Sequence, residues 1–370
     1  MELAGVPIRR IGERIVEGID PTLLVLILTL SMLGLAALFS ASIDTPSRVM
    51  AQVVNLCVAM AAMWLVAQVP PQTMMRFAIP AYVIGVAFLI AVALFGDVVN
   101  GARRWLHVGV TRFQPSEMMK LALPLMLAWY FHRRESTLKL RDFALAAVLL
   151  VIPFGLIVRQ PDLGTAALVG AVGFYVIFFA GISWKVLGGL AALGLAALFP
   201  LWSVLHDYQR RRVLTLLDPT QDPLGAGYHI IQSTIAVGSG GLSGKGWLNG
   251  TQAHLEFIPE RHTDFIFAVY SEEFGLIGNL ILLVLYALLI GRGLVIAANA
   301  ATVFARLMAG AVTLMFFTYA FVNMGMVSGI LPVVGVPLPF LSYGGTALLT
   351  LFIGAGILMS VQRHRKLVQT

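Results

Sequence analysis

Asp264 is the residue of this chain whose type and position best suit acid–base chemistry. It follows the polar stretch 260–263 and precedes a long apolar run, so its carboxylate is expected at the mouth of an apolar cavity. Loss of surrounding water raises the basicity of a carboxylate, which a general base requires. A second interpretation stays open, because Thr263 or Asp264 could instead cap the helix that the apolar run predicts.

Other ionisable residues also stand at the ends of apolar runs. Glu117 and Lys120 are three residues apart at the start of one run, so their side chains meet on a helix. Such a pair is either purely structural or functional, and ionisable groups inside a membrane are functional candidates by default. Asp162 opens a further run and either caps its helix or lines a pocket. Glu272 and Glu273 precede the solidly apolar part of their run and are expected at the membrane interface.

Basic residues occur in several polar segments, where guanidinium and ammonium groups can bind phosphate. They are Arg48, Arg103, Arg104, Arg159, Arg210, Arg211, Arg212, Lys245 and Arg261. One charged run is usually just solvated, whereas cations on several segments that face one side favour an anionic phosphate ligand. The glycine-rich run 238–246 follows no predicted strand and lacks the phosphate-loop pattern, which favours a hinge over a nucleotide site. Trp105 is either an interfacial anchor or a wall for a sugar or lipid.

The elements that must position these residues are membrane helices. The chain is 59% hydrophobic and only 12% charged, whereas soluble domains carry about 25% charged residues. Apolar runs of about 20 residues, the length that crosses a bilayer as a helix, recur along the whole chain. We therefore predict an all-α polytopic membrane protein. Its ten transmembrane helices are expected at about 21–41, 48–69, 77–95, 116–131, 143–159, 164–182, 184–205, 264–291, 305–330 and 344–361.

These helices form one domain, residues 21–361, between an N-terminal segment (1–20) and a C-terminal tail (362–370). Short segments on the side of the termini carry the excess of Lys and Arg, which places both termini in the cytoplasm. The polar clusters then face the opposite side. They include a large loop, 206–263, in which residues 228–237 are expected to form an amphipathic helix on the bilayer surface. Cys57, the single cysteine, has no partner for a disulfide or a metal site.

Taken together, the polar stretches resemble those of the SEDS family of cell-wall polymerases, and the rod-shape-determining RodA type in particular. The matching stretches are Gly101–Leu106, Phe113–Glu117 with Lys120, Gln160–Thr165, His206–Arg210, Asp218–Gln232, Gly238–Leu242, Phe257–Phe265 and Pro337–Gly345. The resemblance covers residues 21–361, and residues 228–232 and 260–264 resemble the elongation branch of the family more than the division branch.

The resemblance implies a peptidoglycan glycosyltransferase that polymerises lipid II into glycan strands during cell elongation and releases undecaprenyl pyrophosphate. It implies an inner-membrane protein that acts on the outer face of the membrane. The expected partners are lipid II, a class B penicillin-binding transpeptidase and other membrane proteins of the elongation complex, with no nucleic acid. A divalent cation, Mg²⁺ or Mn²⁺, is the cofactor that could assist departure of the pyrophosphate.

Residue roles follow from the same resemblance. Asp264 is expected to be the general base, Lys120 to offset charge on the leaving group, and Glu117 to orient Lys120. The residues expected to bind substrate are Arg48, Trp105, Asp162, Arg210, Lys245, Arg261 and Ser342.

Two other functions stay open at this point. A flippase for lipid-linked precursors would carry polar residues at mid-depth and on both sides of the membrane, whereas here they gather toward the outer end. A non-catalytic scaffold for the transpeptidase predicts that charge-neutral changes at Asp264 and Lys120 are harmless.

Overall fold

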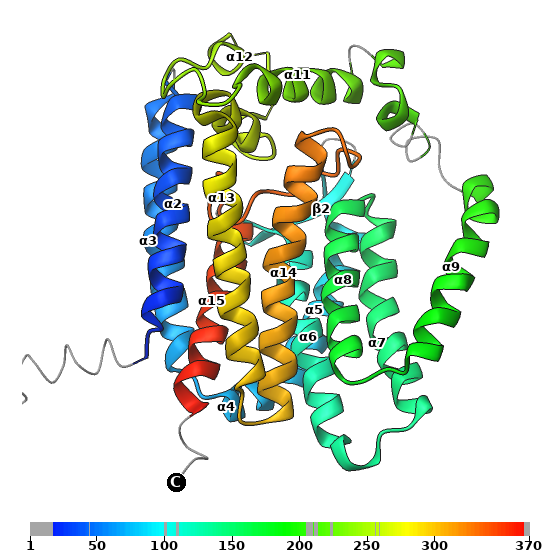
Figure 1. Ribbon diagram of the computed structural model, residues 1–370. Coiled ribbons are helices and arrows are strands. Elements are labelled where there is room, and N and C mark those ends of the chain that lie inside the picture. Colours follow the sequence, from blue (N-terminus) through cyan, green and yellow to red (C-terminus); the bar gives the residue numbers. More distant parts are fainter. Residues whose placement is uncertain are drawn as a thin grey trace, which may run out of the picture.

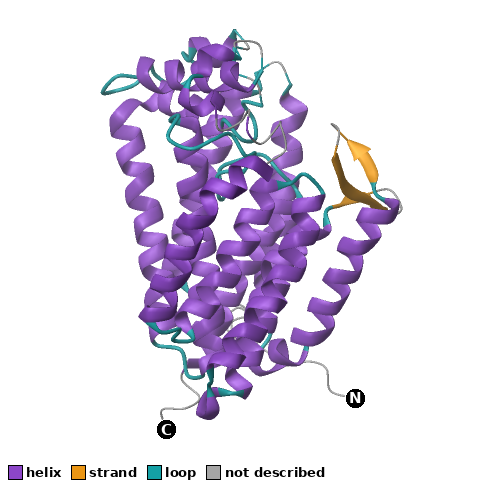
Figure 2. Ribbon diagram, turned by 90° about the vertical axis from the view of Figure 1, so that its right-hand side faces the viewer, coloured by secondary structure: helices purple, strands orange, loops and turns teal. Residues whose placement is uncertain are grey.

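The computed structural model describes residues 18–43, 45–99, 102–108, 111–204, 210, 214–222, 225–255, 257–258 and 260–365. Within these ranges the chain forms a bundle of long helices, with shorter helices and a small group of strands at one end (Figure 1, Figure 2). The start of α2 (Pro21–Ala41) and the end of α15 (Thr346–Arg363) lie together at the opposite end, where Asp20 and Arg363 line one polar pocket. The polar elements and the described ends of the chain therefore occupy opposite ends of the bundle.

The remaining long helices run roughly alongside these two (Figure 1). They are α3 (Pro46–Gln68), α5 (Ala78–Phe95), α6 (Pro115–Arg133), α7 (Leu140–Arg159), α8 (Leu163–Phe179), α9 (Trp184–Val204), α13 (Ile266–Ala298) and α14 (Val303–Val327). Among the described residues, seven helices are long and apolar enough to cross a membrane: α2, α3, α5, α7, α13, α14 and α15. The predicted spans coincide closely with the observed helices, except that α13 continues seven residues further, to residue 298 instead of 291. A count of ten membrane crossings stays a prediction.

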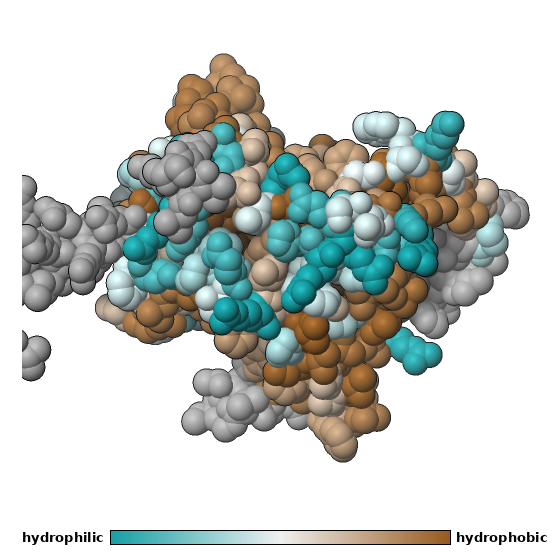
Figure 3. Space-filling view, turned by 90° about the horizontal axis from the view of Figure 1, so that it is seen from below, coloured by the Kyte–Doolittle hydropathy of each residue, from teal (hydrophilic) through white to brown (hydrophobic). Residues whose placement is uncertain are grey.

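Helices α14 and α15 form the centre of the bundle. Of the most apolar 18-residue stretch of each helix, 72% is buried in α14 and 67% in α15, against 22% in α3 and in α7. Outer helices can leave apolar side chains uncovered because lipid tails are as apolar as leucine. Seen from the end that carries the C-terminus, hydrophilic side chains gather over the helix ends and hydrophobic ones form much of the rim (Figure 3). This distribution is the one that a bilayer around the bundle requires.

Three short strands connect α5 to α6. They are β1 (Asp97–Val99), β2 (Ala102–Val108) and β3 (Thr111–Phe113), antiparallel and in the order β1-β2-β3. Leu106 faces Phe113 across β2 and β3, and Asp97 faces Trp105 across β1 and β2. The all-α prediction included no strand here. Pairing satisfies the backbone groups of a polar connection that has no helix of its own.

The long loop before α13 is largely ordered into short helices. Residues 226–239 form α11 (Ala226–Ser239), which lies across the end of the bundle (Figure 1). Its buried residues Ile230, Ser233 and Ala236 repeat every three positions, as one face of a helix does. The predicted helix in this loop is confirmed. Arg211 and Arg212 lie outside the described residues.

Shorter elements complete the chain. They are α4 (Pro71–Arg76), η1 (Glu135–Thr137), η2 (Pro219–Gln221) and α12 (Thr251–His254). The elements η2 and α12 belong to the long loop. Together with α11 they give much of its described part a helical backbone.

Candidate active site

A cavity of about 170 Å³ lies where β2, α6, α8, α15 and the loop before α15 meet. Its lining residues are Arg104, Trp105, Gln114, Glu117, Lys120, Asp162, Thr165, Leu168, Gly335, Val336, Pro337, Thr346 and Ala347. Five residues named from the sequence therefore come together: Trp105, Glu117, Lys120, Asp162 and, from the list of basic residues, Arg104. Residues 335–337 form another part of the wall. Gly335 among them has no side chain, which leaves room for a ligand.

Lys120 and Glu117 form a buried ion pair in the first turns of α6. The distance between Lys120 Nζ and Glu117 Oε1 is 2.5 Å, and only 2% of the lysine side chain is exposed. Lys120 Nζ also donates a hydrogen bond to the hydroxyl of Tyr319 on α14. Glu117 Oε2 is buried and makes no hydrogen bond to any described residue. The pair therefore keeps one acceptor available at the cavity.

Tyr319 is a site residue that the sequence analysis missed. It stands in the middle of an apolar run, where a tyrosine gives no local signal beyond the rule that a buried hydroxyl needs a partner. Its side chain is completely buried, and only the packing of α14 against α6 brings it to Lys120.

Asp162 both caps a helix and lines the cavity. Its Oδ1 accepts a hydrogen bond from the Thr165 backbone N–H (3.2 Å) at the start of α8. Its Oδ2 accepts one from Gln114 Nε2 (3.1 Å) and lies 4.0 Å from Arg104 Nε. The two interpretations of this residue are therefore compatible. Gln114, which was not predicted, and Arg104, which was predicted only among the phosphate-binding cations, contact the carboxylate from the other side.

Asp264 lies beside the same cavity, on the turn before α13. It is half-buried, and a methyl group placed on Gly335, a residue of the cavity wall, would lie 3.3 Å from Asp264 Oδ2. Helix α13 begins after Phe265, and no capping side chain accepts a hydrogen bond from its first backbone N–H groups. The capping interpretation of Thr263 and Asp264 is therefore wrong for this helix. Burial, and secondly the nearby Glu260 carboxylate, raise the pKa of Asp264 to about 6.

Two neighbouring segments hold the Asp264 turn in place. Asn323 on α14 donates from Nδ2 to the carbonyl oxygens of Asp264 (2.8 Å) and Val336 (2.7 Å). Ser342 Oγ donates to the carbonyl oxygen of Thr263 (2.7 Å) and accepts from the Leu338 N–H (2.7 Å). The Ser342 hydroxyl is thus engaged within the protein, and Ser342 is not among the cavity-lining residues. Its predicted contact with substrate stays a prediction.

Ser342→Ala should lower both stability and activity. The substitution leaves the buried Leu338 N–H and the partly buried Thr263 carbonyl without this partner, which costs about 1–3 kcal/mol, and it frees the Asp264 turn. We expect a lower melting temperature in detergent and a slower turnover than for the wild type.

A matched control is Ser360→Ala at the other end of the bundle. Ser360 is fully buried and donates to the carbonyl of Val69, so this variant should lose stability without losing turnover per folded molecule. Equal effects of both variants on turnover would show that Ser342 does not act through the Asp264 turn.

The other predicted cations do not line the cavity. Arg261 is buried and donates from Nε to the carbonyl of Ala41 (2.9 Å), which ties the Asp264 turn to the end of α2. Arg48 is exposed in the first turn of α3, and Arg210 is half-buried next to residues outside the described ranges. Lys245 pairs with Glu272 (2.6 Å). Phosphate binding by these four residues stays a prediction.

Glu272 and Glu273 differ from their predicted position at the membrane interface. Their exposed fractions are 0% and 1%, because the long loop folds over them. That loop supplies Lys245 to Glu272, and Ser40 on α2 donates to Glu273. Local sequence does not show this burial, because the covering residue Lys245 lies 27 positions before Glu272.

A divalent cation at this site would need several side-chain ligands close together. Within the part of the chain that the structure describes, no group of three or more His, Cys, Asp or Glu side chains is placed to hold a metal ion. The two carboxylates of the cavity wall, Glu117 and Asp162, are each engaged by Lys120, Gln114 or a backbone N–H. A divalent cation therefore stays a prediction, without protein ligands assigned to it.

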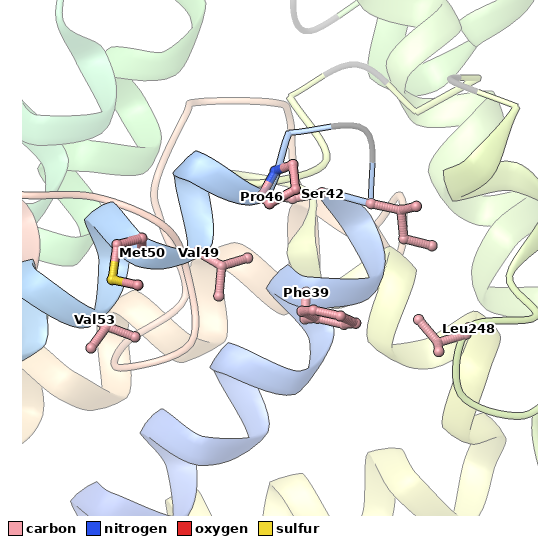
Figure 4. A pocket seen from close by; sticks show the side chains of 8 residues that line it. Phe39, Ser42, Pro46, Val49, Met50, Val53 and Leu248 are labelled. Atoms are coloured by element: carbon pink, nitrogen blue, oxygen red, sulfur yellow. The ribbon is translucent and has the colours of Figure 1, made fainter.

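An apolar groove of about 430 Å³ opens beside the Asp264 turn (Figure 4). Side chains from α2, α3 and the long loop surround it: Phe39, Ser42, Ile43, Pro46, Val49, Met50, Val53 and Leu248. At one edge Ser42 Oγ and His262 Nδ1 are 3.1 Å apart, so the groove adjoins the segment that carries Asp264. An apolar chain bound here would have its polar end near that turn.

A membrane-embedded helical bundle with a charged cavity and an apolar groove at one end defines an integral membrane protein built for an amphiphilic ligand. The chain belongs to the FtsW/RodA/SpoVE family, whose model, described as cell cycle protein, matches residues 21–367. The resemblance to SEDS proteins is thereby confirmed.

Named relatives cover nearly the whole chain. The peptidoglycan glycosyltransferase MrdB of Escherichia coli K12 is 52% identical over 352 residues, 95% of each chain. The peptidoglycan glycosyltransferase RodA of Treponema pallidum is 32% identical, with 95% of this chain and 99% of the relative covered.

Two solved structures share the fold. One chain of a peptidoglycan synthase complex, described as coordinating polymerization and crosslinking, is 36% identical with a TM-score of 0.82 and coverage of 94% and 98%. The rod shape determining protein RodA of Thermus thermophilus is 31% identical with a TM-score of 0.72 and coverage of 94% and 97%.

Proposed function

We propose that this chain is a peptidoglycan glycosyltransferase that polymerises lipid II into glycan strands. The observation that carries the proposal is a half-buried carboxylate, Asp264, at the wall of a cavity that also holds a buried lysine. The names of the relatives support the reaction class. A lipid-linked sugar pyrophosphate needs a polar reaction site next to a groove for its apolar chain, and both are present at one end of the bundle.

In the proposed reaction Asp264 removes the proton from the 4-hydroxyl of the acceptor sugar. The oxygen forms a bond to the anomeric carbon of the donor, the bond from that carbon to the pyrophosphate breaks, and undecaprenyl pyrophosphate leaves with inversion. Lys120 offsets the charge that develops on the leaving group, in a site where water no longer weakens the attraction. Glu117 and Tyr319 hold the lysine ammonium in place, and Asp162 with Gln114 shapes the cavity wall.

The apolar groove of Figure 4 suits an isoprenoid chain at the level of the Asp264 turn. Arg48 stands on the same first turns of α3 as Val49 and Met50, which line the groove. It would meet the pyrophosphate of a bound lipid, with Arg210 and Arg261 as further candidates. Both termini are proposed to lie in the cytoplasm, with the cavity on the outer face of the inner membrane.

A class B penicillin-binding transpeptidase is the proposed partner. One solved relative belongs to a complex of polymerization and crosslinking. On this chain, α13 and α14 border an apolar groove of about 360 Å³ that includes Tyr286, Phe317 and Phe321. A transmembrane helix of the partner would fill such a groove by close packing, which is what drives helix association in lipid.

The proposal is tested by incubating the purified protein with lipid II in detergent, with and without the transpeptidase. Glycan chains are expected in at least the arm with the partner. A flippase would form no polymer in detergent, where there is no second compartment, and a scaffold would form none without another polymerase. Absence of product in both arms would refute the proposed activity.

The polymerisation rate should depend on pH through Asp264. A base must be ionised to act, and the acidic limb of kcat/KM reports its pKa in the free enzyme. Since burial raises the pKa of Asp264 to about 6, kcat/KM should fall tenfold for each pH unit below about 6, half-maximal near that value. The measurement is the initial rate of chain formation between about pH 3.5 and 8. A half-maximal rate near pH 4, the ordinary value for an aspartate, would contradict a buried base.

A further inference from the structure

Helix α13 is interrupted near its start, and a loop from outside the helix is inserted into the interruption. Gly275 has φ 63° and ψ −160°, far from helical values. Such a break leaves the N–H groups of the next turn and the carbonyls of the preceding turn without their helical partners, which is costly at membrane depth.

Residues 241–246 supply new hydrogen-bond partners for four of these backbone groups. The N–H groups of Leu276 and Ile277 donate to the carbonyls of Gly241 (2.9 Å) and Leu242 (3.1 Å). The carbonyls of Glu272 and Glu273 accept from the N–H groups of Lys245 and Gly246, both at 3.0 Å. In an unbroken helix residues 276 and 277 would have bonded to residues 272 and 273. The loop therefore occupies the place of two helical hydrogen bonds.

Glycine is required where the loop enters. A methyl group on Gly244 (φ 79°) would lie 2.0 Å from the carbonyl oxygen of Glu273, and one on Gly275 would lie 2.3 Å from the nitrogen of Gly244. These distances leave no room for any side chain. Gly241 also has a positive φ (57°), but a methyl group there would meet nothing within 4 Å.

An ion pair secures the inserted loop. Lys245 Nζ lies 2.6 Å from Glu272 Oε1, and the glutamate side chain is fully buried. The same Oε1 accepts hydrogen bonds from Thr251 Oγ1 (3.1 Å) and from the Gln252 N–H (3.0 Å), and Lys245 also donates to Thr251 (2.8 Å). We call residues 241–246 together with the Lys245–Glu272 pair the clasp.

The clasp closes a long excursion of the chain. Lys245 and Glu272 are 27 positions apart in the sequence, and the residues between them include Arg261 and Asp264. On one side this segment is held by Asn323 and Ser342, as described above. The clasp provides a further attachment, which joins the two ends of the segment.

We propose that Lys245 and Glu272 are positioning residues for the transferase reaction, which hold Asp264 against the cavity wall by closing the segment between them. The inference rests on the proposed function of Asp264. It gives Lys245 a role in place of phosphate binding, since its ammonium is engaged by Glu272 and Thr251 and Lys245 is not among the residues that line the cavity.

Loosening the clasp would let water reach Asp264. The charged groups around that carboxylate are Glu260 on its own turn and, across the cavity, Glu117, Lys120, Asp162 and Arg104. The four groups across the cavity stand on other segments, and Glu260, which lies within the closed segment, is the lesser cause of the raised pKa. A change in the basicity of Asp264 would therefore report its exposure to water, because burial is the main cause of its raised pKa.

The first test is the double variant Lys245→Met/Glu272→Gln in the full-length protein. It removes both charges together, so no buried charge is left alone, and the glutamine oxygen can still accept from Gln252. We expect polymerisation to slow by about tenfold or more, as misplacement of a reacting group by a fraction of an ångström does. The acidic limb of the rate profile should move from about pH 6 toward about pH 4.

The matched control is Asp20→Asn/Arg292→Met. This pair also joins α13 to another segment, and its side chains are 3% and 27% exposed, against 0% and 29% in Glu272 and Lys245. Asparagine retains the cap of α2. The control variant should melt at a lower temperature but keep the acidic limb at its wild-type position, because the pair lies at the far end of α13.

A second pair of variants leaves all charges in place. Gly244→Ala forces the loop away from the Glu273 carbonyl, whereas Gly241→Ala introduces comparable backbone strain without a clash. Only Gly244→Ala should reproduce the slower rate and the shifted limb.

Hydrogen–deuterium exchange gives a readout that does not depend on activity. The clasp variants should exchange faster at residues 251–265, whereas exchange in the second half of α13 should match the wild type. Where the polymerisation rate is too low for a pH profile, the proposal is tested by the increase in exchange at residues 251–265, compared with the Asp20→Asn/Arg292→Met control. Wild-type exchange at 251–265, or faster exchange with the limb still near pH 6, would refute the proposal. If the wild-type protein forms no glycan chains, the proposed function fails, and exchange still tests the clasp.

Discussion

Replacing Asp264 by asparagine is expected to lower the rate of lipid II polymerisation by about 10²- to 10⁴-fold, the contribution of a positioned general base. Asparagine has almost the same shape and retains an oxygen toward the cavity wall at Gly335, but it cannot take up a proton. The backbone bond from Asn323 to residue 264 does not involve the side chain and is preserved. The variant should therefore fold, insert and be expressed like the wild type.

The same substitution should not lower stability, which separates a catalytic role from a structural one. The pKa of Asp264 is about 6 in the folded protein, above the ordinary value near 4. The folded state thus binds the proton more tightly, so this group stabilises the protein at low pH, and that stabilisation is lost as the pH rises through 6. At neutral pH the buried charge is a cost, and its removal should leave the melting temperature equal or higher.

The measurement is chain formation and thermal melting of the purified Asp264→Asn protein at pH 7.5. Glu260→Gln is the control, because it removes an exposed carboxylate four residues away and should change the rate only a few-fold while moving the acidic limb slightly downward. An Asp264→Asn protein that polymerises at near wild-type rate would show that another group is the base. A large fall in its melting temperature would favour a structural role.

The second large effect is expected from Lys120→Met. The substitution leaves the Glu117 carboxylate buried without its cation, and breaking a buried pair from one side typically costs about 3–5 kcal/mol. The Tyr319 hydroxyl also loses the hydrogen bond that it accepts from Lys120. We expect a strongly lowered melting temperature together with loss of polymerisation.

The double variant Glu117→Gln/Lys120→Met separates the two effects. With both charges gone the buried cost largely disappears, and most of the lost stability should return. Activity should not return, because the cation that offsets charge on the pyrophosphate is still missing. A double variant that regains both stability and turnover would show that the pair serves only the fold.

A comparison pair lies at the opposite end of the bundle. Arg134 and Asp142 are 3.1 Å apart, with Asp142 almost fully buried. Arg134→Met should lower stability but leave the rate per folded molecule unchanged. Loss of turnover in that variant would mean that any weakening of the bundle stops the reaction.

The positions of the long helices were predictable because each must satisfy its own backbone inside the bilayer. This requirement makes a helix and its apolar run coincide, so that predicted 21–41, 143–159 and 344–361 correspond to α2, α7 and α15 within a few residues. The pairing of Glu117 with Lys120 was predictable for the same local reason, since residues three apart on a helix are neighbours.

Other features depend on contacts between distant segments. The three short strands between α5 and α6 were not predicted, and their pairing satisfies the backbone between two helices. Glu272 and Glu273 looked like surface residues, but the loop 241–246 covers them. The hydroxyl of Ser342 bonds to the carbonyl of Thr263, which is 79 positions away, a contact that local sequence does not indicate.

The sequence by itself determined that this is a helical membrane protein, where most of its helices begin and end, and which ionisable residues stand at their ends, because helix formation in lipid depends on runs of neighbouring residues. Only the tertiary structure decided which of these residues share one cavity. It placed Asp264 beside Gly335, brought Tyr319 to Lys120, and engaged Lys245 with Glu272. Each of these contacts joins residues that are 27 or more positions apart, and the packing of helices and loops against one another sets such distances, whereas local sequence does not.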